Sequence, residues 1–579
     1  MNGWHGRLLH VDLGRGRCRS ESIPTALLHA YLGGRGLGVR LLRDDYHRDP
    51  ADPDLPLLFA VGPLCGTVAP TSSRLVVVSR SPLTGTVFAA SAGGPFARRL
   101  KAAGFDAVRI VGVSPQPVVL TLTPHGGELR PAAQLWGKRV AATVAALAEH
   151  GSVAAIGPAG ENGVLYASIV MGDGEAVGRG GLGAVMGSKQ LKAITVAGDL
   201  PTVVADPVRL ESARQNVMRL FRASPVLLGE LGLGEFGTPA FVDLMAQRRL
   251  TPTENFRKTH FPSCASYAGP ALHRAFAPLR YGCDDCPIEC KKRTAQGLAL
   301  PEYEAVSHFG ALNGIADLQT IVAANALCSD LGLDPISAAA TLAAWGEMRG
   351  RFPRPAEVGP LLEAIAARRG DGELLARGSR RLTVARGRPE LAMAVKSLEL
   401  PAYDPRGVYG MALAYATGNH GGCHLSAYPI AHEILRKPVP TDRFSFAGKA
   451  RMIKIAEDSN AAIDSLVACK LAFLGASLEE YADLLAAVTG SEYSTQALMV
   501  IGERIWMSER FYNQQNGFTA ADDTLPERFF TEPGSSGDGI AIPPIDRSRF
   551  AEELAKYYAM RGLNSQGGFA DPAFLEYQP

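Results

Sequence analysis

Three thiols lie within eight residues in the stretch Cys283-Asp284-Asp285-Cys286-Pro287-Ile288-Glu289-Cys290. A loop with this spacing can supply three of the four thiolates of a [4Fe–4S] cluster, and the distant Cys469 can supply the fourth. A structural zinc site usually pairs two short Cys-x-x-Cys arms, and this sequence has no second arm. The spacing therefore favours a redox cluster over zinc, and it favours both over three unrelated thiols.

The composition is that of an ordinary globular protein. Of the 579 residues, 46% are hydrophobic and 20% are charged, and the length predicts two to four domains. The net charge of +2 gives no case for nucleic acid as a partner. The first residues contain no apolar segment of the kind that directs export, and no run of about 18 apolar residues could span a bilayer. With nine cysteines, three of them clustered, we expect a soluble cytoplasmic metalloprotein.

The residue pattern that indicates secondary structure changes twice along the chain. The first third is β-rich, with short apolar or β-branched runs at residues 55–64, 74–79, 107–113, 118–123 and 193–197. Helical spacing of apolar residues follows at 207–221, 318–331, 336–349 and 360–369. A loop-rich stretch at 397–424 opens a last region with helical stretches at 449–475 and 495–513. We therefore predict three domains, at 1–205, 206–394 and 395–579.

A glycine-rich segment runs from residue 178 to residue 189. Its glycines permit close approach of backbone N–H groups to an anion, and Arg179 can hold a phosphate with two hydrogen bonds. The order Gly187-Ser188-Lys189 differs from that of a P-loop. Taken alone, the segment is equally well explained as a tight turn.

Two hexads and two short loops carry further polar candidates. The hexads, 329–334 and 464–469, each start with a polar residue and end in a potential ligand, although such residues are more often helix ends. Glu304 follows Pro301-Glu302-Tyr303, and His424 ends the stretch Asn419-His420-Gly421-Gly422-Cys423-His424. These two are candidate acid–base groups, and a solvated Glu and a turn His are the ordinary alternatives.

In this order, the segments resemble the aldehyde ferredoxin oxidoreductase family of tungsten enzymes. The resemblance runs nearly from end to end of the chain. It includes Ala60-Val61-Gly62-Pro63-Leu64, Ser81-Pro82-Leu83-Thr84-Gly85, Ile156-Gly157-Pro158-Ala159-Gly160-Glu161-Asn162, residues 178–189, Leu400-Pro401-Ala402-Tyr403-Asp404-Pro405-Arg406-Gly407, Gly421-Gly422-Cys423-His424 and Asp522-Asp523-Thr524-Leu525-Pro526.

The resemblance implies an α+β fold in which a β-rich N-terminal domain cradles the cofactor and two mainly α-helical domains close over it. It implies a bis-pyranopterin tungsten (or molybdenum) cofactor, one [4Fe–4S] cluster held by Cys283, Cys286, Cys290 and Cys469, and a magnesium ion that bridges the pterin phosphates. The residues expected to bind the cofactor are Arg74, Ser91, Gly93, Arg179, Gly180, Gly183, Ser329, Asp334, Ser426, Asp464 and Cys469.

Four positions depart from the family pattern. Ser91 stands where the family has an asparagine near magnesium, and Ser329 stands where a carboxylate is usual. Val467-Ala468 replaces a Gly-Leu pair in the second hexad, and Ser426 replaces a lysine. These changes bear on the contacts to the cofactor and on the choice between tungsten and molybdenum.

The activity that the resemblance implies is oxidation of an aldehyde to a carboxylic acid, with Glu304 and His424 facing the substrate and electrons leaving to ferredoxin or a partner subunit. One alternative is the catalytic subunit of a class II benzoyl-CoA reductase or another low-potential reductase of the superfamily. An electron-transfer or scaffold protein that holds only the cluster is the alternative from a different class. Some family members join subunits through an iron held by Glu-x-x-His, and the matching residues here are Ala323-Ala324-Asn325-Ala326. We therefore expect no bridging iron in a homodimer or hetero-complex.

Overall fold

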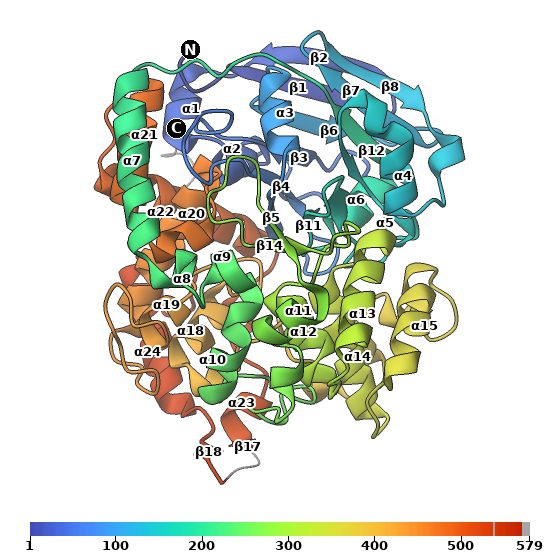
Figure 1. Cartoon of the computed structure of the whole chain (residues 1–579), viewed down its shortest axis with the longest axis vertical. Helices are drawn as coiled ribbons and strands as arrows, with labels where there is room; N and C mark the ends of the chain where they lie inside the picture. Colours follow the sequence, from blue (N-terminus) through green and yellow to red (C-terminus); the bar gives the residue numbers. More distant parts are fainter. Residues whose placement is uncertain (536–538, 570–579) are drawn as a thin grey trace.

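The computed structural model describes residues 1–535 and 539–569. Strands dominate the first 200 residues, and helices dominate the rest (Figure 1). The predicted fold class, a β-rich N-terminal part followed by mainly helical parts, is confirmed. The division into three domains near residues 205 and 395 stays a prediction.

Two six-stranded sheets form the N-terminal part. The first has the strand order β2-β1-β6-β3-β4-β5 and the second has the order β11-β10-β9-β12-β7-β8. The strands of the first sheet are β1 (Arg7–Asp12), β2 (Arg17–Ser22), β3 (Leu57–Ala60), β4 (Leu75–Arg80), β5 (Val87–Ala92) and β6 (Ala107–Val111). Those of the second are β7 (Val118–Thr123), β8 (Gly126–Pro131), β9 (Ser152–Ala155), β10 (Ile169–Met171), β11 (Ala176–Val177) and β12 (Leu191–Val196).

The register of β4 and β5 places the first site residues. These strands pair antiparallel, with Leu75 opposite Ala92 and Val76 opposite Ser91. Just beyond this end of the ladder, Arg74 Nη1 lies 3.3 Å from the position that a Cβ on Gly93 would take. The β4 segment from Leu75 to Ser79 is buried throughout, as its unbroken apolar sequence indicates. Two predicted cofactor contacts thus meet at one end of this strand pair.

Most helices match the predicted stretches. Helices α7 (Pro207–Ala223), α13 (Leu318–Leu331), α14 (Pro335–Met348) and α22 (Thr495–Gln515) agree with prediction to within about two residues. Helix α15 (Pro355–Ala366) begins earlier than residue 360, because Pro355 occupies its first position and the Glu357 carboxylate accepts the Arg354 N–H.

The prediction of a helical stretch at residues 449–475 was wrong in its second part. Helix α20 (Lys449–Leu466) ends where Val467 adopts a left-handed backbone, with φ +57°. The chain then turns, and the Cys469 N–H donates to the Thr71 carbonyl at 3.0 Å. A β-branched residue rarely adopts this backbone, so surrounding contacts must hold it. The break turns Cys469 out of the helical path and toward the β-rich part.

No helix in the described ranges is both long enough and apolar enough to cross a membrane.

Candidate functional site

A β-hairpin holds the loop with the three clustered cysteines. Strands β13 (Leu279–Tyr281) and β14 (Lys291–Arg293) pair antiparallel, and residues 282–290 form the loop between them. The Cys286 N–H donates to the Cys283 carbonyl at 3.0 Å. Asp285 and Glu289 have positive φ values of 55° and 47°, which tighten the loop. The hairpin thus presents three thiols from a compact turn.

Cys469 joins these thiols from the far end of the chain. Burial first, and then the nearby Cys469 and Cys283, raise the pKa of the Cys286 thiol to about 12. Burial also raises the pKa of Cys290 well above its usual value, and Cys469 adds to this shift while Lys291 opposes it. Thiols of this kind stay protonated until a metal ion displaces the proton. All four predicted cluster cysteines therefore share one buried environment.

The arrangement differs from that of a mononuclear metal site. Within residues 1–535 and 539–569, no three His, Cys, Asp or Glu side chains converge closely enough to hold a single metal ion. Zinc requires ligands about 2.0–2.3 Å from one centre. A [4Fe–4S] cluster takes its four thiolates from separate protein positions around a larger core. The four-cysteine cluster stays a prediction from the sequence.

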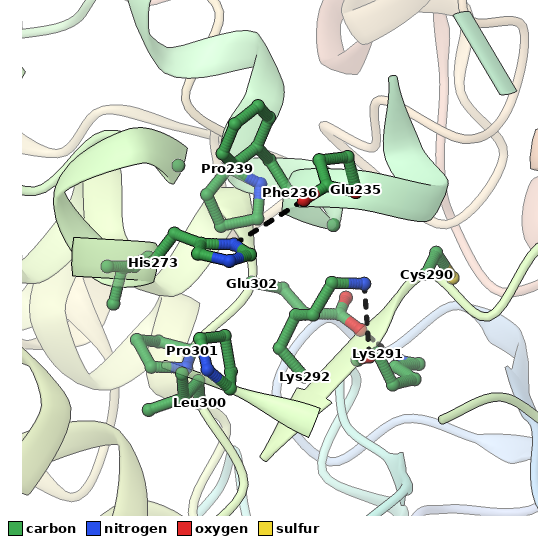
Figure 2. Close-up of a pocket in the computed structure, with 14 residues that line it drawn as sticks. Glu235, Phe236, Pro239, His273, Cys290, Lys291, Lys292, Leu300, Pro301 and Glu302 are labelled. Atoms are coloured by element: carbon green, nitrogen blue, oxygen red, sulfur yellow. Dashed lines mark hydrogen bonds and ion pairs between the residues drawn. The ribbon is translucent and has the colours of Figure 1, made fainter. Parts of the chain in front are cut away.

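A small pocket is lined by Cys290 together with Glu235, His273 and Lys292 (Figure 2). Within it, His273 Nδ1 lies 3.8 Å from Glu235 Oε1. The Lys292 amine donates to the carbonyls of Glu289 at 2.9 Å and Lys291 at 3.2 Å. Burial lowers the pKa of Lys292 to about 8. The Lys292 contacts thus help to fix the end of the cluster loop at Glu289.

Arg74, Ser91 and Gly93 lie at one end of the β4–β5 strand pair, where Gly93 adjoins the cluster loop. Arg74 donates through Nε to the Ser91 hydroxyl at 2.9 Å and through Nη2 to the Ser91 carbonyl at 3.2 Å. A Cβ atom on Gly93 would lie only 2.2 Å from Cys283 Sγ. Any side chain at residue 93 would therefore collide with a predicted cluster ligand. Sequence reasoning did not explain this need for glycine.

Arg179 lies at the centre of the second group of predicted residues. It donates through Nη1 to the Gly422 carbonyl at 3.1 Å and through Nη2 to the Glu399 carbonyl. Its Nε lies 3.7 Å from Asp334 Oδ2 and has no hydrogen-bond partner among the described residues. The side chain therefore bridges the glycine-rich segment to the loop that precedes His424.

The glycines beside Arg179 have different roles. Gly180 has φ +82°, and a Cβ atom there would meet the Phe88 ring at 2.6 Å. Gly183 lies in α6 (Leu182–Ser188), its N–H donates to the Ala167 carbonyl, and a Cβ atom would lie 2.4 Å from the Ser168 carbonyl oxygen. Close packing thus accounts for Gly183. The N–H of Gly183 is bonded within the protein, and its place among the cofactor-binding residues stays a prediction.

Glu304 and His424 face each other across the same region. Glu304, in α12 (Tyr303–Phe309), accepts the Ala402 N–H at 2.9 Å through Oε2. Its Oε1 lies 3.7 Å from His424 Nε2, which is too long for a direct hydrogen bond. Both side chains are largely buried, at 14% and 13% exposure. The two predicted acid–base residues are thus brought together.

Burial shifts the pKa values of both Glu304 and His424 away from their usual range. It raises the pKa of Glu304 to about 7, although the Ala402 N–H and Arg179 act in the opposite direction. Burial also lowers the pKa of His424 well below its usual value, and the positive charges of Arg179 and Lys470 lower it further. His424 is therefore a neutral imidazole at neutral pH, whereas Glu304 can gain or lose a proton there.

Two tyrosine rings enclose His424. Its ring centroid lies 5.9 Å from that of Tyr403 and 6.5 Å from that of Tyr428. The two tyrosine hydroxyls lie 3.3 Å apart. Tyr428 has φ +52°, a strained backbone for an aromatic residue. Sequence reasoning missed both tyrosines as site residues, although Tyr403 lies inside a motif that it quoted.

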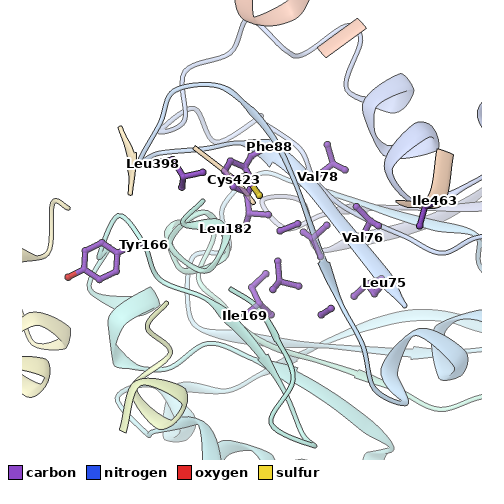
Figure 3. Close-up of a cluster of buried hydrophobic side chains, with 14 of the residues drawn as sticks. Leu75, Val76, Val78, Phe88, Tyr166, Ile169, Leu182, Leu398, Cys423 and Ile463 are labelled. Carbon is purple, nitrogen blue, oxygen red and sulfur yellow. The ribbon is translucent and has the colours of Figure 1, made fainter. Parts of the chain in front are cut away.

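Buried hydrophobic side chains pack against the loop that carries His424. Figure 3 shows Phe88 and Leu182 of the N-terminal part near Cys423, the residue before His424. The Phe88 ring also contacts His420, with centroids 4.7 Å apart. One continuous cluster of buried side chains joins these segments. The loop with His424 is thus fixed against the glycine-rich segment.

The two hexads behave differently from each other. The Ser329 hydroxyl donates to the Asn325 carbonyl within α13, and Asp330 accepts the Ala141 N–H, so it is directed toward another helix. Asp334 caps α14 through the N–H groups of Ile336 and Ser337. The first hexad is therefore a helix end and a helix start.

In the second hexad, Asp464 pairs with Lys470 at 2.7 Å and with Arg35 at 3.4 Å. Asp464 and Cys469 thus lie on either side of the break at Val467.

Several buried polar atoms around this site have no partner within the described residues. They are Arg179 Nε, Glu304 Oε1, His424 Nδ1 and Ser426 Oγ. Each unpaired buried polar group costs about 1–3 kcal/mol, so such a group of atoms indicates a ligand. The cations Arg74, Arg179 and Lys470 suit a group that carries phosphates. The residues present therefore fit the implied pterin cofactor.

Comparison with known proteins agrees with this geometry. The family model for the aldehyde ferredoxin oxidoreductase N-terminal domain matches residues 8–198, and the model for domains 2 and 3 matches residues 212–576. The chain belongs to the aldehyde ferredoxin oxidoreductase family. Two tungsten-containing aldehyde ferredoxin oxidoreductases, from Pyrococcus furiosus and Thermococcus kodakarensis, are each 39% identical to it over 98% of this chain and 97% of the relative.

A more distant sequence relative and a solved structure are also similar to this chain. The aliphatic sulfonate oxidoreductase WOR-like subunit of Pyrococcus furiosus is 26% identical over 98% of this chain and 96% of its own length. A solved structure of the active site complex BamBC of benzoyl coenzyme A reductase with 1,5-dienoyl-CoA superposes with a TM-score of 0.84. It covers 99% of this chain and 97% of that one, at 23% identity. The protein is thus an oxidoreductase of the aldehyde ferredoxin oxidoreductase family.

Proposed function

We propose that the protein oxidises an aldehyde to the corresponding carboxylic acid and passes the electrons, one at a time, through a [4Fe–4S] cluster to ferredoxin or a partner subunit. In this reaction aldehyde and water give the acid, two protons and two electrons. The observation that carries the proposal is the Glu304–His424 pair, whose facing groups keep unpaired polar atoms beside Arg179. A protein that only held a cluster would have no use for this group.

The residues described above would hold the cofactor. Arg74 and Arg179 would pair with pterin phosphates, the Ser91 hydroxyl would approach the magnesium ion, and Gly93 and Gly180 would allow close approach of the backbone. Asp334 and Asp464, with Ser329, Ser426 and Cys469, would be directed toward the pterins. When bound, the tungsten or molybdenum centre supplies the two-electron chemistry.

The proton chemistry belongs to Glu304 and His424. A carboxylate with a pKa of about 7 can take a proton from water or from the aldehyde hydrate at neutral pH. Neutral His424 can orient the substrate oxygen through one ring nitrogen, because the Tyr403 and Tyr428 rings fix its plane. Glu304 is therefore assigned as the general base and His424 as the group that positions the carbonyl.

The activity should rise with pH through neutrality. Because burial raises the pKa of Glu304 to about 7, the basic carboxylate predominates only above that pH. We expect kcat/KM to increase about tenfold per unit below pH 7 and to level off above it. Steady-state kinetics between pH 5.5 and 8.5 would check this, with Glu304→Gln expected to lose the acidic limb. If kcat/KM of Glu304→Gln still fell below pH 7, a group other than Glu304 would be responsible for the pH dependence.

Metal and pterin analysis of protein purified without oxygen would test the proposal against its alternatives. Tungsten or molybdenum with pterin, together with iron, is the expected result, and iron alone would favour the electron-transfer alternative. The likeness to the benzoyl coenzyme A reductase structure concerns the fold alone. Turnover of aldehydes, rather than reduction of an aromatic thioester, would separate the two enzyme classes.

We expect no iron between subunits. Within α13, residues Ala323, Ala324, Asn325 and Ala326 supply neither the Glu nor the His that a Glu-x-x-His iron site needs. Iron in the holoenzyme should therefore equal four per chain, all of it in the cluster. Elemental analysis normalised to protein would check the count. An additional half iron per chain in a dimer would contradict this prediction.

A further inference from the structure

A buried ion pair lies directly beside the cluster loop. Lys291, which follows Cys290 and begins β14, places its Nζ 2.8 Å from Glu175 Oε1 and also pairs with the Glu302 carboxylate. Glu175 ends the turn between β10 and β11 in the second sheet. The Lys291 and Glu175 side chains are 16% and 12% exposed. The pair thus joins the cluster hairpin to the β-rich part, out of bulk water.

The carboxylate meets a cluster thiol at Gly93. From the position that a Cβ on Gly93 would take, Cys283 Sγ lies at 2.2 Å, Glu175 Oε2 at 3.2 Å and Arg74 Nη1 at 3.3 Å. One thiol, one anion and one cation therefore surround a single point. The carboxylate of Glu175 carries the anion of this group through its 2.8 Å ion pair with Lys291.

We propose that Lys291 and Glu175 act in opposite directions to set the reduction potential of the cluster held by Cys283, Cys286 and Cys290 with Cys469. This inference rests on the proposed function, because it requires the cluster. Reduction adds one electron, and therefore one negative charge, to the cluster. The adjacent Lys291 cation stabilises the reduced form, and the Glu175 anion destabilises it. No bond of either side chain forms or breaks.

Because the Lys291–Glu175 pair is little exposed, its charges act strongly on the cluster. Charges on the protein surface are screened by water and salt within about 10 Å. Lys291 and Glu175 are mostly shielded from solvent, so their charges act on the cluster through a medium of lower dielectric constant. Arg293, two residues further along β14, is exposed and stacks on the Tyr281 ring with 5.1 Å from Cζ to the centroid. Arg293 is therefore a matched control, because solvent screens its charge from the cluster.

A dithionite titration of the anaerobically purified holoenzyme, followed by electron paramagnetic resonance, tests the proposal. The solution is poised at the potential where half of the parent cluster is reduced. We expect the ratio of reduced to oxidised cluster to fall about tenfold in Lys291→Gln and to rise about tenfold in Glu175→Gln. A tenfold change corresponds to 59 mV for a one-electron couple. Lys291→Arg keeps the charge. This variant and Arg293→Gln should both show the same ratio of reduced to oxidised cluster as the parent protein.

Other results would overturn the proposal. Unchanged ratios, or shifts of the same sign in Lys291→Gln and Glu175→Gln, would show that the charges do not set the potential. Loss of iron from either variant, with iron retained in the parent, would show that the pair holds the loop in place instead. Absence of a cluster from the parent would instead refute the proposed function, so the two failures are distinguishable.

Discussion

Replacing Glu304 by Gln is expected to lower kcat with an aldehyde at least 100-fold while leaving the cofactor content unchanged. General acid–base assistance contributes about 10²–10⁴-fold, and the amide cannot accept the proton. The amide keeps the size of the side chain and can still approach the Ala402 N–H, so the site should stay folded. His424→Asn should lose at least the same lower factor, because it removes the ring that faces Glu304 at 3.7 Å.

Anaerobic kinetics with a viologen acceptor, normalised to bound tungsten or molybdenum, would measure these effects. Glu128→Gln and His125→Asn are suitable controls, because both residues are exposed in the β7–β8 hairpin. The controls should match the parent. Parent rates in both Glu304→Gln and His424→Asn would show that a solvated Glu and a turn His are the correct interpretation.

Cys286→Ala is expected to strip most of the iron from the protein. Cys286 supplies the middle thiol of the loop and shares its buried environment with Cys283 and Cys469. A [4Fe–4S] cluster needs four thiolates, and no other cysteine is expected to replace this one. Iron analysis and the spectrum of the reduced protein would check the loss.

Cys18→Ala is the matched control for this experiment. Cys18 lies in β2, is half-buried and belongs to no predicted ligand set. It should keep four irons per chain. If Cys286→Ala also kept four irons, with an unchanged reduced-state spectrum, the cluster assignment would fall.

Local sequence patterns predicted the fold class and the main elements well. Hydrophobic periodicity identified α7, α13, α14 and α22, because each has an apolar face over more than three turns. It failed at Val467, since the break there depends on contacts with a distant segment rather than on a helix-stop residue. Helix α15 was predicted to begin at residue 360, too late by five residues, because Pro355 at its first position starts it earlier.

The site was only partly predictable, for a related reason. The spacing of the cysteines singled out their loop, whereas only the family resemblance raised Glu304 and His424 above ordinary loop residues, and the roles of all of them stay predictions. Glu175 approaches the cluster loop across more than 100 residues of intervening chain, and only its place after a Gly in a tight turn hinted at a role. The close packing that requires glycine at residue 183 depends on Ser168, and the sequence pattern alone does not show it.

The central claim is that this chain oxidises aldehydes at a tungsten or molybdenum centre. Anaerobic measurement of aldehyde-dependent viologen reduction, with the acid product quantified and the rate normalised to bound metal, tests it most directly. We predict one acid formed for every two electrons accepted, with a rate that follows tungsten or molybdenum content and collapses in Glu304→Gln. Metal-loaded protein that reduces viologen with no aldehyde, or that forms no acid, would contradict the account.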